Sequence, residues 1–323
     1  MSSEQRPVIV VPGRMHPRVL ARLPDTFEMI RLDEADPALV SPELGAKAVG
    51  IATTNRLPAD FLAAFQSVEI VANFSVGYDG IAVEAAAERG VVVTNTPDVL
   101  NEEVADTAIA LLLNSLRRFP AAEAYLRAGH WAQKGPFPLT PLSLRGRSVG
   151  IYGLGRIGQA IARRLEGFGL PISYHTRSRR DDVAYTYYPS LKAMAEAVDT
   201  LISIVPGSDE TRHTLNAEIF QALGSRGVVI NVGRGSTLDE TALVAALKEG
   251  TIAAAGLDVF ENEPHVPEDL IALENATLLP HVASASEDTR NAMADLVVDN
   301  LKSWFATGKA LTPVPETPFE RKG

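Results

Sequence analysis

Three glycines in this sequence have a spacing that suits phosphate binding. The segment SVGIYGLGRIGQAIARRL contains the pattern G-x-G-x-x-G, directly after an apolar run and directly before a stretch of helical period. The first glycine permits a tight turn, the second lets the backbone approach a pyrophosphate, and the third lets helix and strand pack closely. The N–H groups that begin the helix would also face the phosphates. We therefore predict a dinucleotide site; the alternative is a glycine-rich turn without a ligand. The residues expected there are Gly153, Leu154, Gly155, Arg156, Ile157 and Gly158.

A second feature of this region is a basic turn at a place where many dinucleotide sites are acidic. NAD sites of this kind usually carry Asp or Glu about 20 residues after the glycines, where it accepts a hydrogen bond from the ribose 2′-hydroxyl. Here residues 174–179 read YHTRSR, and no carboxylate follows before Asp181. Arg177 could instead pair with a 2′-phosphate, to which Thr176 and Ser178 could donate hydrogen bonds. We expect NADP(H), with NAD as a less efficient cofactor; the alternative is a solvated basic turn.

The composition excludes several kinds of chemistry. The 323 residues include no cysteine, which removes disulfides, thiol nucleophiles and thiolate metal sites and fits a reducing compartment. The 40 acidic and 30 basic side chains give a net charge of −10, so we expect no nucleic-acid partner. Neither a signal-peptide pattern nor an apolar run of membrane-spanning length is present. We expect a cytoplasmic protein without a metal site or a membrane partner.

Elements of alternating type must position these residues. Short runs rich in Val and Ile alternate with Ala- and Leu-rich stretches of helical period, which is typical of parallel sheets with connecting helices. The runs are nearly continuously apolar, which indicates strands buried on both faces. The expected strands form two series: 8–11, 28–32, 49–53, 69–73 and 91–94, then 148–153, 172–175, 200–205, 227–232, 253–258 and 277–279.

Helices and connections complete this α/β pattern. We expect helices at 59–65, 83–89, 101–118 and 287–305. Residues 129–146 contain Pro and Gly and are expected to form the loop that enters the second domain. The Pro-rich tail LTPVPETPFERKG has too little apolar surface for a core of its own, so we expect it to pack on the first domain or to fray.

Three further segments make the pattern recognisable. They are INVGRGSTLDE with Arg234, GLDVFENEP with Glu263, and LLPHVASAS with His281. Together with the glycine-rich loop, NFSVGYDGI and EEVADTAIALLL, their order and spacing resemble the D-isomer-specific 2-hydroxyacid dehydrogenase family over nearly the whole chain. The basic turn at Arg177 resembles the glyoxylate, hydroxypyruvate and hydroxyphenylpyruvate reductase branch more than the phosphoglycerate or lactate branches.

The resemblance implies reduction of a small 2-keto acid, such as glyoxylate or hydroxypyruvate, to a D-2-hydroxy acid. Hydride is delivered to C2 while the carbonyl oxygen takes a proton, so a positioned acid is needed, and histidine suits that role. His281 would be the general acid, and Glu263 would orient its ring and favour the imidazolium form. Arg234 would bind the substrate carboxylate and keto oxygen. The alternatives are a solvated glutamate, a histidine that merely ends a strand, and an exposed arginine in a turn.

The family also implies further binding residues. The turn of Ser75, Val76 and Gly77 would offer backbone N–H groups to the substrate carboxylate. Asp258 resembles the residue that holds the nicotinamide carboxamide. The remaining expected cofactor residues are Thr107, Val205, Pro206, Thr211, Val232 and Ser284. We interpret His213, in a T-x-H segment, as part of the loop structure near the cofactor.

The implied architecture is two doubly wound parallel-sheet domains with a cleft between them. A flavodoxin-like substrate domain (1–101 and 285–323) would carry an inserted Rossmann cofactor domain (102–284). The segment between Arg118 and Gly146 resembles the family's dimerisation arm, so we expect a homodimer, with Trp131 close to the partner's pocket. A competing function is that of a dinucleotide-sensing partner protein, because relatives of that kind keep the same three residues.

Overall fold

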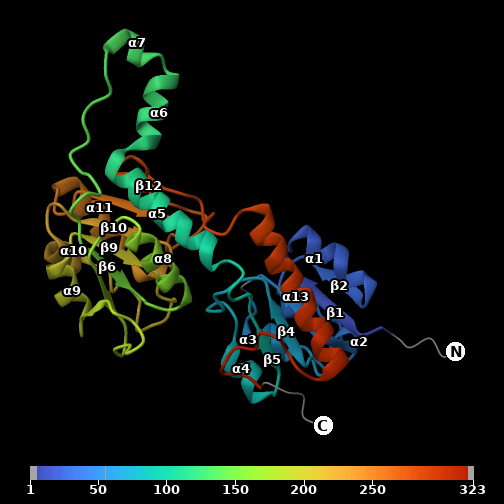
Figure 1. The fold of residues 1–323 in the computed structure, drawn as a ribbon. Coiled ribbons are helices and arrows are strands. Elements are labelled where there is room, and N and C mark those ends of the chain that lie inside the picture. The colour runs from blue at the N-terminus through green and yellow to red at the C-terminus, as the bar shows by residue number, and fades with distance from the viewer. Residues whose placement is uncertain (1–5, 55, 319–323) are drawn as a thin grey trace. The chain divides into compact units, whose positions relative to one another are not determined.

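The computed structural model describes residues 6–54 and 56–318. The chain divides into two compact units (Figure 1). One contains the residues up to Leu100 together with those from Ala285 onward, and the other spans Asn101–Ser284. Each unit is built on a parallel sheet with helices between the strands. The predicted α/β class with two parallel-sheet units is thus confirmed.

The first unit has a five-stranded sheet of order β2-β1-β3-β4-β5. Every residue of β1, β4 and β5 is buried, which explains their mainly apolar character. The strands are β1 (Val8–Pro12), β2 (Glu28–Leu32), β3 (Ala48–Thr53), β4 (Ile70–Asn73) and β5 (Val92–Thr94). The helices are α1 (Pro17–Arg22), η1 (Leu23–Asp25), η2 (Pro37–Leu39), α2 (Pro42–Lys47), α3 (Ala59–Ala63), α4 (Val83–Glu88) and α13 (Glu287–Thr307).

The second unit has a seven-stranded sheet of order β12-β11-β10-β9-β6-β7-β8, in which neighbouring strands pair in parallel. Its strands are β6 (Val149–Tyr152), β7 (Ile172–His175), β8 (Thr186–Tyr187), β9 (Thr200–Ser203), β10 (Val228–Asn231), β11 (Ala254–Leu257) and β12 (Ala276–Leu278). Its helices are α5 (Asn101–Arg117), α6 (Phe119–Arg127), α7 (His130–Lys134), α8 (Arg156–Glu166), α9 (Leu191–Ala197), α10 (Ala217–Leu223), η3 (Gly235–Thr237), α11 (Glu240–Glu249) and α12 (Glu268–Ile271). Within residues 6–54 and 56–318, no helix combines the length and apolar character that a membrane span requires.

Two parts of the second unit differ from the prediction. A loop was expected over 129–146, but α7 lies inside this stretch, and α6 precedes it. Arg118 and Gly129, both at positive φ (53° and 74°), end one helix and allow the next to begin in a new direction. Figure 1 shows α6 and α7 standing off from the rest of their unit. The two-residue strand β8 was also not predicted, because so short a strand has no recognisable period.

The tail after α13 packs on the first unit. The N–H of Val314 donates to Val93 O at 2.8 Å, and Val93 N–H donates to Thr317 Oγ1 at 3.1 Å. Val314 and Thr317 are buried. The tail therefore extends the edge of the sheet beside β5 as far as Thr317, while residues 319–323 lie outside the described residues.

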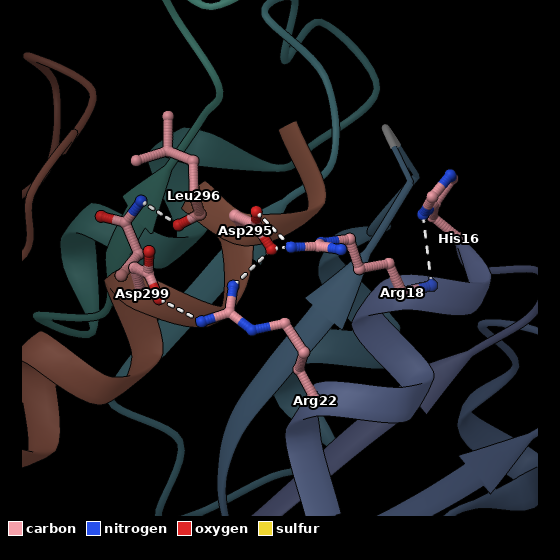
Figure 2. Close-up of polar contacts among 7 residues, drawn as sticks. His16, Arg18, Arg22, Asp295, Leu296 and Asp299 are labelled. Carbon is pink, nitrogen blue, oxygen red and sulfur yellow. Dashed lines mark hydrogen bonds and ion pairs between the residues drawn. The ribbon is translucent and has the colours of Figure 1, made fainter. Parts of the chain in front are cut away.

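Ion pairs join α1 to α13 in the first unit (Figure 2). Arg18 Nε and Arg22 Nη1 each lie 2.6 Å from Asp295 Oδ1, and Arg22 Nη2 lies 2.8 Å from Asp299 Oδ1. The hydrogen bond from Arg18, which outweighs the opposing effect of burial, and the interaction with Arg22 lower the pKa of Asp295. Asp295 thus couples the first helix of the chain to the last long one.

We expect Asp295→Asn to lower the free energy of unfolding of the first unit by about 1 kcal/mol, since these pairs are partly exposed. The pKa of Asp295 is lower in the folded than in the unfolded state, so its contribution is full above the unfolded pKa and is lost as pH falls through the folded pKa. Urea unfolding of wild type and variant at pH 7 and near pH 3 measures this. A difference in midpoint that is as large in acid as at pH 7 would contradict the assignment.

Candidate active site

The residues expected to function in the second unit gather along one edge of its sheet. Because its strands are parallel, their carboxyl ends share this edge. Strand β6 pairs with both β9 and β7, so the chain order reverses beside the glycine-rich loop, where ligands of such sheets bind. The segments that follow the strands carry Gly153 after β6, Thr176 after β7, Val205 after β9, Arg234 after β10, Asp258 and Glu263 after β11, and His281 after β12.

His281 and Glu263 form a hydrogen-bonded pair. His281 Nδ1 lies 2.7 Å from Glu263 Oε2, and the other carboxylate oxygen accepts the N–H of Phe260 at 3.0 Å. An ionised carboxylate only accepts hydrogen bonds, so Nδ1 carries the hydrogen and Nε2 is the ring nitrogen left to exchange a proton with a ligand. The His281 side chain is about half exposed, at 48%. The pair has the arrangement that a general acid requires.

Several charges keep Glu263 ionised. Burial acts to raise the pKa of Glu263, but the hydrogen bonds from His281 and from Phe260 N–H, with the charges of His281 and Arg234, outweigh it and lower the pKa. The carboxylate is therefore negative throughout the neutral range and attracts a positive charge on the ring.

The backbone of His281 is held in an unusual conformation. Its φ of 53° lies in the left-handed region, which costs a residue with a side chain on the order of 1 kcal/mol. Asp258, fully buried, accepts the N–H groups of Val282 and Ala283, both at 2.8 Å. Thr107 Oγ1 on α5 donates to Ala283 O at 3.3 Å. These bonds fix the turn that presents the imidazole and continues into Ser284.

Burial raises the pKa of Asp258, and the two N–H donors oppose this rise only in part. Both of its oxygens are already hydrogen-bonded to the His281 turn. The Asp258 carboxylate thus holds the turn that follows His281.

Arg234 lies between two glycines that the backbone requires. A Cβ on Gly233 would lie 2.7 Å from Val205 O, and one on Gly235 would lie 1.9 Å from the carbonyl carbon of Phe260. The loop therefore packs directly on the segments after β9 and β11, and the second contact brings Arg234 close to the chain that carries Glu263.

Two side chains hold the backbone of this loop. Arg234 O accepts hydrogen bonds from Asn231 Nδ2 at 3.0 Å and from Thr237 Oγ1 at 2.7 Å. Asn231 and Thr237 are fully buried. The position of the arginine is thus set by polar groups under the loop.

The glycine-rich loop between β6 and α8 has room for a ligand at its second glycine. A Cβ on Gly153 (φ 98°) would meet Val205 Cγ1 at 2.9 Å, and one on Gly158 would lie 2.1 Å from Gly153 O, whereas one on Gly155 would meet nothing within 4 Å. Among the described residues, no acceptor takes the N–H of Leu154 or Gly155. Open space and free donors at the start of a helix fit a pyrophosphate. Arg156 and Ile157 follow in the first turn of α8.

The turn after β7 contains an exposed arginine whose side chain is not paired with another described residue. Thr176 Oγ1 donates to Ser178 O at 2.6 Å and closes the turn. Arg177 is exposed, and within residues 6–54 and 56–318 its side chain has no hydrogen bond or ion pair. An exposed, unpaired guanidinium one strand away from the phosphate loop fits a 2′-phosphate.

The loop after β9 is closed by Thr211, whose Oγ1 donates to Pro206 O at 2.8 Å and accepts Ser208 N–H at 2.9 Å. Val205 packs on Gly153, and Val232, after β10, is buried. His213 Nε2 lies 2.9 Å from Glu261 Oε1, and Arg212 Nη2 lies 2.5 Å from that same oxygen.

In the first unit, the turn of Ser75, Val76 and Gly77 follows β4. Its three carbonyls accept Thr96 N–H at 2.9 Å, Asn95 Nδ2 at 2.8 Å and Asn73 Nδ2 at 2.9 Å, in that order. In the described part of the chain, no acceptor takes the N–H groups of these three residues. A turn with its carbonyls held and its N–H groups free can receive a carboxylate.

Comparison with known proteins decides the family. A family model described as D-isomer specific 2-hydroxyacid dehydrogenase, NAD binding domain, matches residues 109–283, more than half of the chain. The chain is 51% identical over 256 residues to a glyoxylate/hydroxypyruvate reductase of Arabidopsis thaliana, covering 79% of this chain and 81% of that one. This protein belongs to the D-isomer specific 2-hydroxyacid dehydrogenase family.

Two other members of the family are informative. The hydroxyphenylpyruvate reductase of Plectranthus scutellarioides is 50% identical over 256 residues, with 79% of this chain and 81% of that one covered. The crystal structure of the NADPH-dependent glyoxylate/hydroxypyruvate reductase of Sinorhizobium meliloti, in complex with NADP and malonate, is 64% identical, covers 99% of this chain and 100% of that one, and has a TM-score of 0.97. The resemblance read from the sequence is thus confirmed.

Some supporting residues of this dehydrogenase were not identified from the sequence. They are Asn73, Asn95 and Thr96 under the Ser75 turn, Asn231 and Thr237 under Arg234, and Arg180, whose Nη1 donates to Leu154 O at 2.9 Å. The asparagines that end β4 and β10 were an available signal, since strand-end amides often hold turns. Within the described residues, no group of three or more His, Asp or Glu side chains could hold a metal ion.

Proposed function

We propose that this dehydrogenase reduces small 2-keto acids, with glyoxylate and hydroxypyruvate as the primary substrates, to D-2-hydroxy acids with NADPH. The observation that carries the proposal is the His281–Glu263 pair at 2.7 Å, with Arg234 close enough to act on the same carboxylate. The open space at Gly155 and the unpaired Arg177 support the choice of cofactor. The names of the Arabidopsis and Sinorhizobium relatives point in the same direction.

Each residue of the proposed site has a separate role in the reduction. Bound NADPH supplies the hydride for C2 of the keto acid. His281 gives the proton on Nε2 to the carbonyl oxygen, and Glu263 keeps the ring oriented through its hydrogen bond to Nδ1. Arg234 binds the carboxylate and the keto oxygen through its planar fork. The N–H groups of the Ser75–Gly77 turn bind the substrate carboxylate.

The remaining cofactor contacts follow the same edge of the sheet. Asp258 would hold the nicotinamide carboxamide, with Thr107 and Ser284 in the turn it supports. Val205, Pro206, Thr211 and Val232 would line the cofactor site beside the glycine-rich loop. Ser178 would donate to the 2′-phosphate in a turn that the Thr176 hydroxyl closes. The absence of cysteine fits the reducing cytoplasm, where we place the reaction.

A panel of glyoxylate, hydroxypyruvate and hydroxyphenylpyruvate with each cofactor tests this proposal. We expect turnover of glyoxylate or hydroxypyruvate at about 1 to 1,000 per second. Preference for hydroxyphenylpyruvate would move the assignment to the activity named for the Plectranthus relative. NADPH binding without turnover of any of the three would favour the dinucleotide-sensing function.

We also propose that the protein is a homodimer formed through the arm of residues 118–146. No residue of α6 or α7 is buried, and large apolar side chains there are exposed, including Leu126 at 54% and Trp131 at 63%. Apolar surface of this kind on a projecting segment is stabilised when a second copy covers it. Trp131 would then lie close to the partner's pocket.

Light scattering at micromolar concentration should give twice the chain mass of 34.6 kDa. Leu126→Glu should shift the mass toward the monomer, because it places a charge in the buried contact. Phe168→Glu changes an apolar residue of similar exposure outside the arm (48%) and should leave the mass unchanged. A wild-type mass of 34.6 kDa would refute the dimer.

A further inference from the structure

The basic turn after β7 is followed directly by two acids. Asp181 and Asp182 follow Arg177 by four and five residues and are 98% and 60% exposed, and a negative charge beside Arg177 would repel a phosphate. If this turn binds a phosphate, a cation must therefore neutralise these carboxylates or hold them away from the phosphate. The two acids differ in how closely an arginine pairs with them.

Arg180 binds Asp182 through two of the three nitrogens of its guanidinium. Nε donates to Oδ1 at 2.9 Å and Nη2 donates to Oδ2 at 2.5 Å, the parallel arrangement that is strongest between these groups. By contrast, Arg179 Nε is 3.9 Å from Asp181 Oδ1, with both side chains largely exposed. Asp182 is thus paired and Asp181 is only loosely neutralised.

The third nitrogen of the Arg180 guanidinium reaches the glycine-rich loop, where Nη1 donates to Leu154 O at 2.9 Å. The backbone of Arg180 is also fixed, because the hydroxyl of Tyr174 accepts its N–H at 2.8 Å and donates to its carbonyl at 3.1 Å. Tyr174 is completely buried. Both the backbone and the guanidinium of Arg180 are therefore held by hydrogen bonds, whereas the Arg177 side chain has no such bond among the described residues.

We propose that Arg180 is a positioning residue that determines specificity for a phosphate on the cofactor ribose. It neutralises Asp182 and keeps this carboxylate away from Arg177, and it fixes the basic turn against the Leu154 carbonyl. Without Arg180, Asp182 is free to pair with Arg177 or to repel the phosphate. The proposal rests on the proposed use of NADPH, and it concerns a residue that need not touch the phosphate.

The test compares two probes by calorimetry, adenosine 2′,5′-bisphosphate and adenosine 5′-monophosphate, which differ only in the 2′-phosphate. We expect Arg180→Gln to weaken the bisphosphate by about 10-fold, a change of about 1.4 kcal/mol, and the monophosphate by less than about 3-fold. Asp182→Asn in the Arg180→Gln background should restore most of the loss, because it removes the charge that Arg180 had neutralised. The NADPH to NADH ratio of kcat/KM should follow the same order.

Arg179→Gln is the matched control, since it removes the same charge from the same turn but breaks only the loose contact. If it weakens the bisphosphate as much as Arg180→Gln does, the effect is one of net charge and the proposal is overturned. Equal weakening of both probes by Arg180→Gln, or no rescue by Asp182→Asn, also overturns it. A wild type that binds both probes equally instead refutes the use of NADPH itself, which separates the two failures.

Discussion

His281→Ala should lower kcat for glyoxylate and hydroxypyruvate by about 100-fold or more. The variant lacks the group that protonates the carbonyl oxygen, while the glycine-rich loop and the Arg177 turn are unchanged. NADPH binding, followed by fluorescence titration, should therefore stay within about 3-fold of wild type. Single-turnover measurements with preformed enzyme–NADPH complex would place the loss in the chemical step.

Two variants make the result specific. His265→Ala removes an exposed histidine two residues from Glu263 and should leave kcat unchanged. Glu263→Gln keeps an oxygen that can accept the Nδ1 hydrogen but removes the charge that stabilises the pair, so we expect a smaller loss of kcat, about 10-fold at pH 7. Wild-type turnover by His281→Ala would end the assignment of this residue as the acid.

The lowered pKa of Glu263 also determines how activity changes as the solution becomes acidic. Its carboxylate stays ionised when the pH falls through the range of an ordinary glutamate, and it is protonated only below its own, lower pKa. Loss of reductase activity through Glu263 should therefore begin in more acidic solution than for an ordinary glutamate.

The central strands of both sheets could be predicted because burial on two faces requires an almost unbroken run of apolar residues. The runs around Val10, Ile151 and Ile230 are nearly uninterrupted apolar residues, and each lies within a strand that is fully buried. The expected strands and helices end within two residues of the observed ones. Boundaries are set less by side-chain type than by local hydrogen bonds, which explains the remaining differences.

The arm could not be predicted in the same way. Helices α6 and α7 bury no residue, so their apolar side chains do not mark a face against this unit's core. The Pro and Gly residues around them are typical of loops. A helix without a buried face gives no apolar period against its own unit, so its sequence resembles that of a loop.

Some residues of the candidate site could be predicted from the sequence, and others could not. Residues that we propose to bind a ligand, such as Arg234 and His281, stand in spaced motifs and could be named from the sequence. Their supports depend on which strands are neighbours: Arg180 reaches Leu154 only because β6 and β7 pair. The need for glycine at 233 and 235 also depends on neighbouring strands, because backbone of the segments after β9 and β11 fills the space that a Cβ would take.

After the loss of kcat in His281→Ala, the next largest effect that we expect is the preference for NADPH over NADH. A carboxylate at the end of β7 would repel the 2′-phosphate of NADP, whereas Arg177 can form a charge-assisted pair with it, worth roughly 1.5 to 3 kcal/mol. One such pair corresponds to a preference of about 10- to 150-fold. Since no other side chain in the described part of the molecule engages Arg177, no existing ion pair has to be broken for this contact.

We therefore expect NADPH to exceed NADH in kcat/KM by at least about tenfold at fixed hydroxypyruvate. Arg177→Asp should reverse much of that difference, because it removes the partner of the phosphate and adds a repulsive charge, while the new carboxylate can accept the 2′-hydroxyl of NADH. Arg145→Asp, which makes the same charge change at an exposed position before β6, is the control and should leave the ratio unchanged. If Arg177 instead faces only solvent, the two cofactors perform alike and the substitution changes little. Equal efficiencies in the wild type would by themselves be enough to discard the NADP assignment.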